Sequence, residues 1–276
     1  MIAIVTDSTA YLTRAEARKM GVSLAPMTYT CDGSVFHETY VDQNGAFESI
    51  ISSGKLTTTS QTILSTFLSI FEELLQKGYD ILCLTISSRL SGTYSSASIA
   101  ARQLESDRIH LVDTHMVAGG MYLMIAEADR LIRAGLPAGE IAERLRQMRE
   151  NVGTVFSVSD MGPLRRSGRL SAVRQSVGTI LNIRPVFRCV EGGVVFGGSV
   201  RGRYEQVRQM AAAVPPTVRR LIVQHIEDAR LAQMLVSALE QKFPGVPLEV
   251  RRGGPVLAIH LGLGVCSVAW EDGGKG

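Results

Sequence analysis

The chain has 276 residues, of which 45% are hydrophobic and 20% are charged, and its formal net charge is +3. This composition is typical of a soluble globular protein with a sizeable core, and the length suits one large domain or two modest ones. So small a net charge, a single Trp and the lack of interleaved basic and aromatic residues exclude nucleic acid from the expected partners. No apolar run reaches the roughly 18 residues that a membrane span needs.

The four cysteines, Cys31, Cys83, Cys189 and Cys266, show no CxxC spacing. We therefore expect buried free thiols rather than a structural zinc site. Free thiols fit a reducing cytoplasm. The chain also begins with the apolar segment 2–5 rather than with a basic leader and a cleavage site. The prediction is a cytoplasmic protein without a metal.

In the first half of the chain, predicted strands alternate with predicted helices. This alternation indicates a parallel α/β sheet with right-handed crossovers. The turn signal Asp32-Gly33 adds a short hairpin over 28–40. The predicted strands are 2–5, 22–27, 80–86 and 109–112, and the predicted helices are 15–20, 46–53, 63–75, 93–104, 119–134 and 138–151.

After residue 151, hairpin strands are mixed with helices, which indicates an α+β domain with one face of its sheet covered. The turn Glu191-Gly192-Gly193 joins strands 184–190 and 194–198. The other predicted strands are 154–158, 221–225, 248–251 and 264–270, and the predicted helices are 171–181, 203–213 and 229–243. We therefore expect an N-terminal parallel-sheet α/β domain at 1–152 and a C-terminal α+β domain at 153–276.

Three segments of small residues carry the strongest functional signal. Segments 57–61 and 87–93 are rich in hydroxyls and run into predicted helices, and Gly253-Gly254-Pro255 leads to His260. A Ser/Thr cluster at a helix start offers hydroxyls, free N–H groups and the positive end of the helix dipole. Two such starts facing one point would bind an anion without a metal. Their apolar surroundings indicate a ligand with a small acidic head and an apolar body.

Each of these segments also has an ordinary structural interpretation. A helix N-cap accounts for a lone Thr59 or Ser60. Segment 87–93 carries four hydroxyls where one cap would suffice, and it follows a strand at the edge where α/β proteins bind ligands. His260 and His225 both suit a core histidine. The glycines around His260 allow close backbone approach, which favours a site there.

Between residues 165 and 203 there are eight arginines, one acid (Glu191) and no lysine. The ordinary interpretation is a solvated basic face, whereas an all-arginine set favours recognition of carboxylate or phosphate. Arg169 is the candidate for an inward-pointing member. Arg201 and Arg203 are the candidates for an exposed surface that docks a partner protein or an anionic membrane. The arginines are residues 165, 166, 169, 174, 184, 188, 201 and 203.

Several catalytic and cofactor motifs are missing from the chain. There is no phosphate-binding loop, dinucleotide fingerprint, GxSxG nucleophile elbow or HExxH motif. We therefore predict no cofactor and no catalytic residue. The alternative is a small-molecule hydrolase or phosphotransferase that uses Ser91 and His260, although spacing alone cannot assign a triad.

Seven short segments occur in order along essentially the whole chain. They are Asp7-Ser8-Thr9, Thr59-Ser60-Gln61, the run from 87 to 94, Asp113-Thr114, the run from 164 to 170, Asn182-Ile183-Arg184-Pro185, and Gly254-Pro255 with His260, Gly262 and Gly264. Together they resemble the DegV family of bacterial fatty-acid-binding proteins, which includes the FakB component of fatty acid kinase.

The resemblance implies a carrier, not an enzyme, that buries one long-chain fatty acid and presents its carboxylate to a separate ATP-dependent kinase, FakA. Thr59, Ser91, Arg169 and His260 match the family's carboxylate-site positions, and Ser60, Gly92 and Thr93 beside them complete the candidate site. The apolar wall could come from segments 63–75 and 116–125, for which ordinary core is an equally good interpretation, and the small residues of 116–121 would leave room for the tail. The chain departs from the family at Thr62 and Leu263, where proline is usual.

Overall fold

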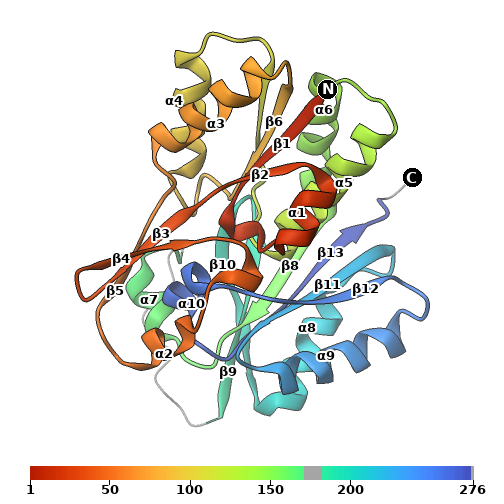
Figure 1. Ribbon diagram of the computed structural model, residues 1–276. Coiled ribbons are helices and arrows are strands. Elements are labelled where there is room, and N and C mark those ends of the chain that lie inside the picture. Colours follow the sequence, from red (N-terminus) through yellow and green to blue (C-terminus); the bar gives the residue numbers. More distant parts are fainter. Residues whose placement is uncertain (171–181, 275–276) are drawn as a thin grey trace.

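The computed structural model describes residues 1–170 and 182–274, and its strands form three sheets (Figure 1). Sheet A is parallel throughout and follows the predicted alternation of strands and helices. Its strands, in spatial order, are β2 (Val22–Ala25), β1 (Ile2–Asp7), β6 (Asp80–Thr85) and β7 (Ile109–Asp113). The helices between these strands in the chain are α1 (Arg14–Met20), α3 (Leu64–Gln76) and α4 (Thr93–Gln103), and α5 (Gly119–Arg133) and α6 (Ala138–Met148) follow β7.

Both faces of sheet A are buried, because successive strand residues point to opposite sides. Val5 and Cys83 pack with α3 and α4, whereas Ile4 and Leu82 pack with α5 and α6. Helix α3 contributes Phe67 and Phe71, both 0% exposed. Segment 63–75 is therefore a core helix of sheet A.

Sheet B is small, antiparallel and built from β4 (Ser34–Glu38), β3 (Met27–Cys31) and β5 (Thr57–Ser60) in that order. The predicted hairpin around Asp32-Gly33 is confirmed. The predicted strand 22–27 is wrong in extent, because Pro26 separates β2 in sheet A from β3 in sheet B. The expectation of a helix start at 57–61 is also wrong for its first four residues, which form β5. A run of threonines is well suited to a strand, and this one pairs with β3.

Sheet C contains six strands, which pair antiparallel except for β11 with β12. In spatial order they are β10 (Gly193–Arg201), β9 (Ile183–Val190), β8 (Val152–Ser157), β13 (Val265–Asp272), β11 (Val218–Ile226) and β12 (Leu248–Arg252). One face packs on α8 (Gly202–Ala213) and α9 (Ala229–Lys242) through residues such as Val223 and Val268.

The other face of sheet C is also covered in part, so the expectation of one covered face is wrong. Ile222 and Ala269 on that face join the core that surrounds α5. Gly119 at the start of α5 permits this packing, since a Cβ there would lie 2.9 Å from Ile222 Cγ2 and 3.2 Å from Ala269 Cβ. Helix α5 thus lies between sheets A and C.

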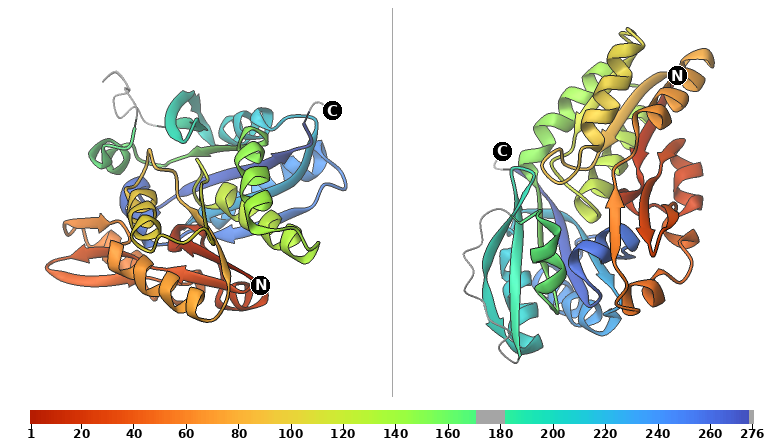
Figure 2. Two further views of the ribbon diagram at one scale, coloured as in Figure 1. Left: turned by 90° about the horizontal axis from the view of Figure 1, so that it is seen from above. Right: turned by 90° about the vertical axis from the view of Figure 1, so that its left-hand side faces the viewer.

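Three short helices complete the described chain: α2 (Phe47–Ser52), α7 (Gly162–Ser167) and α10 (Pro255–Leu261). In Figure 2, α10 lies between the strands of sheet C and those of sheet B. The predicted helix at 171–181 falls outside the described residues. All six strands of sheet C follow residue 151, and the domain boundary near 152 remains a prediction. Within the described ranges, no helix combines the length and the apolar character needed to cross a membrane.

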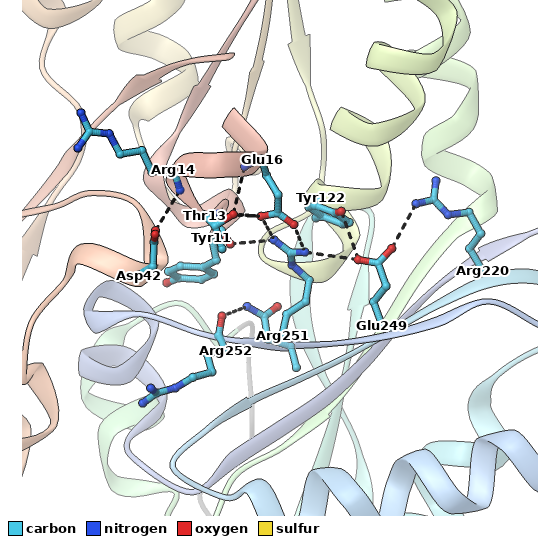
Figure 3. A network of polar contacts seen from close by, with 11 residues as sticks. Tyr11, Thr13, Arg14, Glu16, Asp42, Tyr122, Arg220, Glu249, Arg251 and Arg252 are labelled. Carbon is cyan, nitrogen blue, oxygen red and sulfur yellow. Dashed lines mark hydrogen bonds and ion pairs between the residues drawn. The ribbon is translucent and has the colours of Figure 1, made fainter. Parts of the chain in front are cut away.

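A buried arginine ties the edge strand β12 back to the N-terminal region (Figure 3). The side chain of Arg251 is 8% exposed. Its Nη1 and Nη2 donate to the two carboxylate oxygens of Glu16 at 2.7 and 2.8 Å, and Nη2 also donates to the Tyr11 carbonyl at 3.1 Å. The guanidinium carbon lies 3.7 Å from the ring centroid of Tyr122, which adds a cation–π contact. The contacts of Arg251 thereby hold sheet C against α1 and α5.

Candidate functional site

A cavity of about 350 Å³ lies between sheet C, sheet B, α7 and α10, with the segment after β6 at its side. Its volume falls within the roughly 300–1,000 Å³ of ordinary small-molecule sites. Most of its wall is apolar, as in Met27, Ile86, Phe156, Leu164, Ile226 and Val256. The floor is the face of sheet C that does not pack on α8 and α9. The shape and lining suit an apolar ligand.

A close pair of polar side chains, Thr59 and His260, stands at one end of the cavity. Thr59 Oγ1 and His260 Nε2 share a hydrogen bond of 2.7 Å, although 201 residues separate them in the chain. His260 lies on a short helix rather than on a strand, because Pro255 starts α10 and Gly262, at φ 82°, ends it. Burial and the positive charge of Arg169 lower the pKa of His260 to about 4. The imidazole is therefore neutral at pH 7.

Ser91 lies in the turn before α4, and its hydroxyl is 2.9 Å from that of Thr93. Thr93 is fully buried and does not line the cavity, so it orients the Ser91 hydroxyl from the side away from the cavity. Gly92 does line the cavity. A Cβ at Gly92 would lie 1.9 Å from Gln61 Oε1, so only glycine lets the Gln61 side chain cross here. That side chain donates to Ser96 at 3.0 Å and joins the end of β5 to α4.

Arg169 brings a positive charge to the same end of the cavity. It directly follows Gly168, whose φ of 67° ends α7. The Arg169 guanidinium donates to the Leu90 carbonyl through Nε at 3.5 Å and to the Ser167 carbonyl through Nη1. Its charge lies near enough to His260 to add to the effect of burial on the pKa of that imidazole. Since Arg169 is also exposed, this end of the cavity faces solvent.

The structure thus brings together six of the seven residues of the candidate site. Thr59, Ser60, Ser91, Gly92, Arg169 and His260 all line one cavity, and Thr93 is the exception. They come from four separate elements or turns, and only segment 87–93 is a helix start.

The two arginines that we expected to be exposed lie away from this cavity. Arg201 ends β10 and is exposed. Arg203 is the second residue of α8, and its Nη1 lies 3.1 Å from Asp228 Oδ1, so part of its charge is neutralised. The expected docking surface is therefore less cationic than eight arginines imply.

The prediction of the segments that form the apolar wall is only partly right. Among the residues that line the cavity, none comes from α3, which instead packs on sheet A. Segment 116–125 contributes Val117 and Ala118. The glycines beside them do not leave room, because a Cβ at Gly120 would lie 3.0 Å from the Thr154 hydroxyl. They bring α5 close to sheet C beside the cavity.

Glu38, a buried carboxyl that holds α10 in place, was not predicted from the sequence. Glu38 is 0% exposed. It accepts from the Val256 N–H at 2.9 Å and from the Ser8 hydroxyl at 2.7 Å. Burial raises its pKa to about 7, although these hydrogen bonds oppose the shift. Glu38 lies 218 residues from Val256, and no local pattern predicts such a partner.

Thr62, one of the two departures from the family pattern, lies behind the site. It is 1% exposed, and its hydroxyl donates to the Pro26 carbonyl at 3.1 Å and to the Ala25 carbonyl at 3.3 Å. A hydrogen bond to the chain between β2 and β3 thus stands where the family usually has a proline. Leu263 accepts through its carbonyl from the Ser159 hydroxyl at 2.7 Å.

Fold and site together define a class of protein: an α/β protein with an apolar cavity whose solvent-facing end carries hydroxyls, an imidazole and an arginine. Among the described residues, no group of three or more His, Cys, Asp or Glu side chains is arranged to hold a metal ion. The chain belongs to the DegV family, since the model of that family matches residues 1–272.

Relatives agree with this assignment over their whole length. A DegV domain-containing protein from Halalkalibacterium halodurans is 30% identical over 278 residues, which cover 98% of each chain. A DegV lipid binding protein from Thermotoga maritima has the same fold, with a TM-score of 0.90 at 24% identity over 100% of this chain and 99% of that one. DegV, a fatty acid binding protein from Bacillus subtilis, is 27% identical with a TM-score of 0.82, over 98% of this chain and 99% of that one.

Proposed function

We propose that the protein binds one long-chain fatty acid, with the carboxylate at Thr59, Ser91, Arg169 and His260 and the acyl chain in the apolar cavity. The observation that carries the proposal is the Thr59–His260 pair beside Arg169 at the open end of that cavity. The Bacillus subtilis relative, at 27% identity, is described as a fatty acid binding protein, which supports the same ligand class.

The energetics suit such a ligand. Each buried CH₂ contributes about 0.8 kcal/mol, so the tail supplies most of the affinity. The neutral His260 adds no charge, which leaves Arg169 as the cation that attracts the carboxylate. A carboxylate that accepts from the Thr59 and Ser91 hydroxyls would form charge-assisted hydrogen bonds, which are stronger than neutral ones.

We infer that the protein is a carrier rather than a hydrolase, because the Ser91 hydroxyl is paired with Thr93 and not with a histidine. A catalytic serine needs its base within hydrogen-bond reach, but the Ser91 hydroxyl pairs with Thr93 and the His260 imidazole pairs with Thr59. Within the described part of the chain, no carboxylate forms an ion pair with His260. The hydroxyls are therefore arranged to bind, and a Ser91–His260 catalytic pair is not favoured.

The carrier would present the bound carboxylate to a kinase of the FakA type for acyl-phosphate formation in the cytoplasm. Arg169, whose exposed side chain reaches the open end of the cavity, places the head group where a second protein could reach it. We propose that Arg201 and Arg203 belong to the docking surface for this kinase or for an anionic membrane. Arg201→Glu with Arg203→Glu should slow acyl-phosphate formation or vesicle exchange while the lipid stays bound, since exposed charges act mainly on encounter rates.

The decisive test is organic extraction of the purified protein followed by mass spectrometry. Fatty acid at about one per chain supports the proposal, and an empty protein that hydrolyses an ester unaided contradicts it. Thr59→Val and Ser91→Ala should each weaken fatty-acid binding by roughly 1.5–3 kcal/mol. Thr58→Val and Ser88→Ala are matched controls, because both residues are exposed neighbours that do not line the cavity.

A further inference from the structure

The floor of the apolar cavity carries three polar side chains that the carboxylate site does not use. Thr154 on β8, Gln224 on β11 and Ser267 on β13 all line the cavity. The strand register places Gln224 opposite Ser267, and Ser267 opposite Phe156, two residues from Thr154. Because side chains alternate along a strand, all three belong to the same face as the apolar Ile226 and Val265. We call these three residues the floor patch.

The hydrogen bonding of the floor patch is incomplete. Gln224 is 4% exposed, and its Nε2 donates to the Arg252 carbonyl at 2.9 Å, but its Oε1 is buried without a partner among residues 1–170 and 182–274. Within these ranges, the Ser267 hydroxyl donates to the Gln224 backbone carbonyl at 3.3 Å. The Thr154 hydroxyl faces the sulfur of Met116 at 3.9 Å. Buried polar groups are normally satisfied, so an amide oxygen left alone here points to a partner that the described part of the chain does not supply.

The start of α5 adds donors beside the patch. Its N-cap residue, Ala118, lines the cavity and offers no side-chain hydrogen bond. The next turn lies against Thr154, as the close approach of Gly120 shows. The first N–H groups of a helix lack partners within the helix, and the dipole makes this end positive. This part of the cavity wall therefore combines an unpartnered acceptor with the positive end of a helix.

Resting on the proposed function, we propose that the floor patch is a second polar subsite, which recognises a hydroxyl group carried by the acyl chain at a distance from its carboxylate. A hydroxyl can donate to Gln224 Oε1 and accept from the Ser267 or Thr154 hydroxyl at the same time. A keto oxygen only accepts and would leave Gln224 Oε1 alone. The favoured ligand class is thus a hydroxy fatty acid rather than a plain or an oxo fatty acid.

The test compares stearate with a series of hydroxystearates that differ only in the carbon bearing the hydroxyl, by displacement of a fluorescent fatty acid. One isomer or two adjacent ones should bind at least as tightly as stearate. The remaining isomers, whose hydroxyl meets the apolar wall, should bind about tenfold or more weakly. If every isomer is penalised alike, the patch holds only water and the proposal is wrong. If stearate itself does not bind, the proposed function fails instead.

Variants assign the effect to the patch. Ser267→Ala and Gln224→Met should weaken the favoured isomer by about five- to tenfold and leave stearate unchanged. Ile226→Val, on the same strand and face as Gln224, is the control and should weaken every ligand to the same extent. Ser267→Ala removes one oxygen atom and keeps the test decisive if Gln224→Met folds poorly. Equal losses for stearate and the favoured isomer in Ser267→Ala would overturn the proposal.

Discussion

The ion pair between Glu16 and Arg251 offers a quantitative test of how the edge strand β12 is held. Burial raises the pKa of the Glu16 carboxyl, but the hydrogen bonds and charge of Arg251, together with hydrogen bonds from Thr13, lower it overall to about 2 from 4.5. At about 1.4 kcal/mol per pH unit, this fall corresponds to roughly 3 kcal/mol of stability at pH 7. Glu16→Gln removes the charge while the amide oxygen can still serve the capping box of α1.

The sign of the pH dependence follows from the lowered pKa. The stabilisation is fully present above the unfolded-state pKa of 4.5 and is lost as the pH falls toward about 2. Urea unfolding should therefore show Glu16→Gln to be less stable than the parent by up to about 3 kcal/mol at pH 7. The difference should shrink steadily as the pH is lowered, because the parent also becomes neutral at Glu16.

A control and a double-mutant cycle make the assignment specific. Glu143→Gln breaks an exposed pair, since the Glu143 side chain is 59% exposed beside Arg146, and should cost no more than about 0.5 kcal/mol. Arg251→Met combined with Glu16→Gln should show a coupling energy of at least about 1.5 kcal/mol. Additive losses, or a Glu16→Gln deficit that stays constant down to low pH, would refute the reasoning.

Three further predictions concern the site and its support. Fatty acid should raise the pKa of His260 from about 4, because a carboxylate beside the imidazole favours its protonated form, and an NMR titration in which the pKa does not move would place the carboxylate elsewhere. Glu38 has a pKa raised from 4.5 to about 7, so its folded form holds the proton more tightly and stability falls as the pH rises between those values; Glu38→Gln should flatten that part of the profile in urea unfolding. Gly92→Ala should displace Gln61 and reduce fatty-acid affinity several-fold in a binding titration, whereas Gly139→Ala, whose Cβ would make an ordinary 3.4 Å contact with His110, should bind as the parent does.

The pattern of apolar residues along the chain predicts sheet A well, because its central strands contain continuous apolar runs, 2–5 and 81–84. The error at 57–61 arose where local signals compete, since hydroxyl residues before a helix resemble a cap whether or not they pair as a strand. The length and apolar surface of α3 predicted a buried helix correctly but could not tell a core from a cavity wall, because both are apolar. From the sequence alone, the apolar surface of α3 could have packed on sheet A or lined the cavity.

The candidate site was predictable to the extent that each of its residues stands in a distinctive local setting. Ser91 and His260 are flanked by glycines and hydroxyls that an ordinary core does not need. Glu38 and Gln224 have no such setting, and what makes them informative is a partner, or the absence of one, that appears only when distant strands meet. Charge pairs such as Arg203 with Asp228 are hidden for the same reason, so the count of arginines overstated the free positive charge.

The short helix α10 has a consequence for how the molecule behaves as a unit. It lies between β12 and β13 of sheet C in the chain, yet residues from the opposite end of the sequence hold its first turn. Glu38 accepts from Val256 N–H, and the Tyr11 hydroxyl accepts from Leu257 N–H at 3.2 Å. His260 at its far end meets Thr59 from sheet B. The site is therefore formed by residues from both halves of the chain. A ligand held between them acts as a non-covalent cross-link, so loading should protect segments on both sides of residue 152 from hydrogen exchange together, with a stabilisation that grows with the logarithm of ligand concentration.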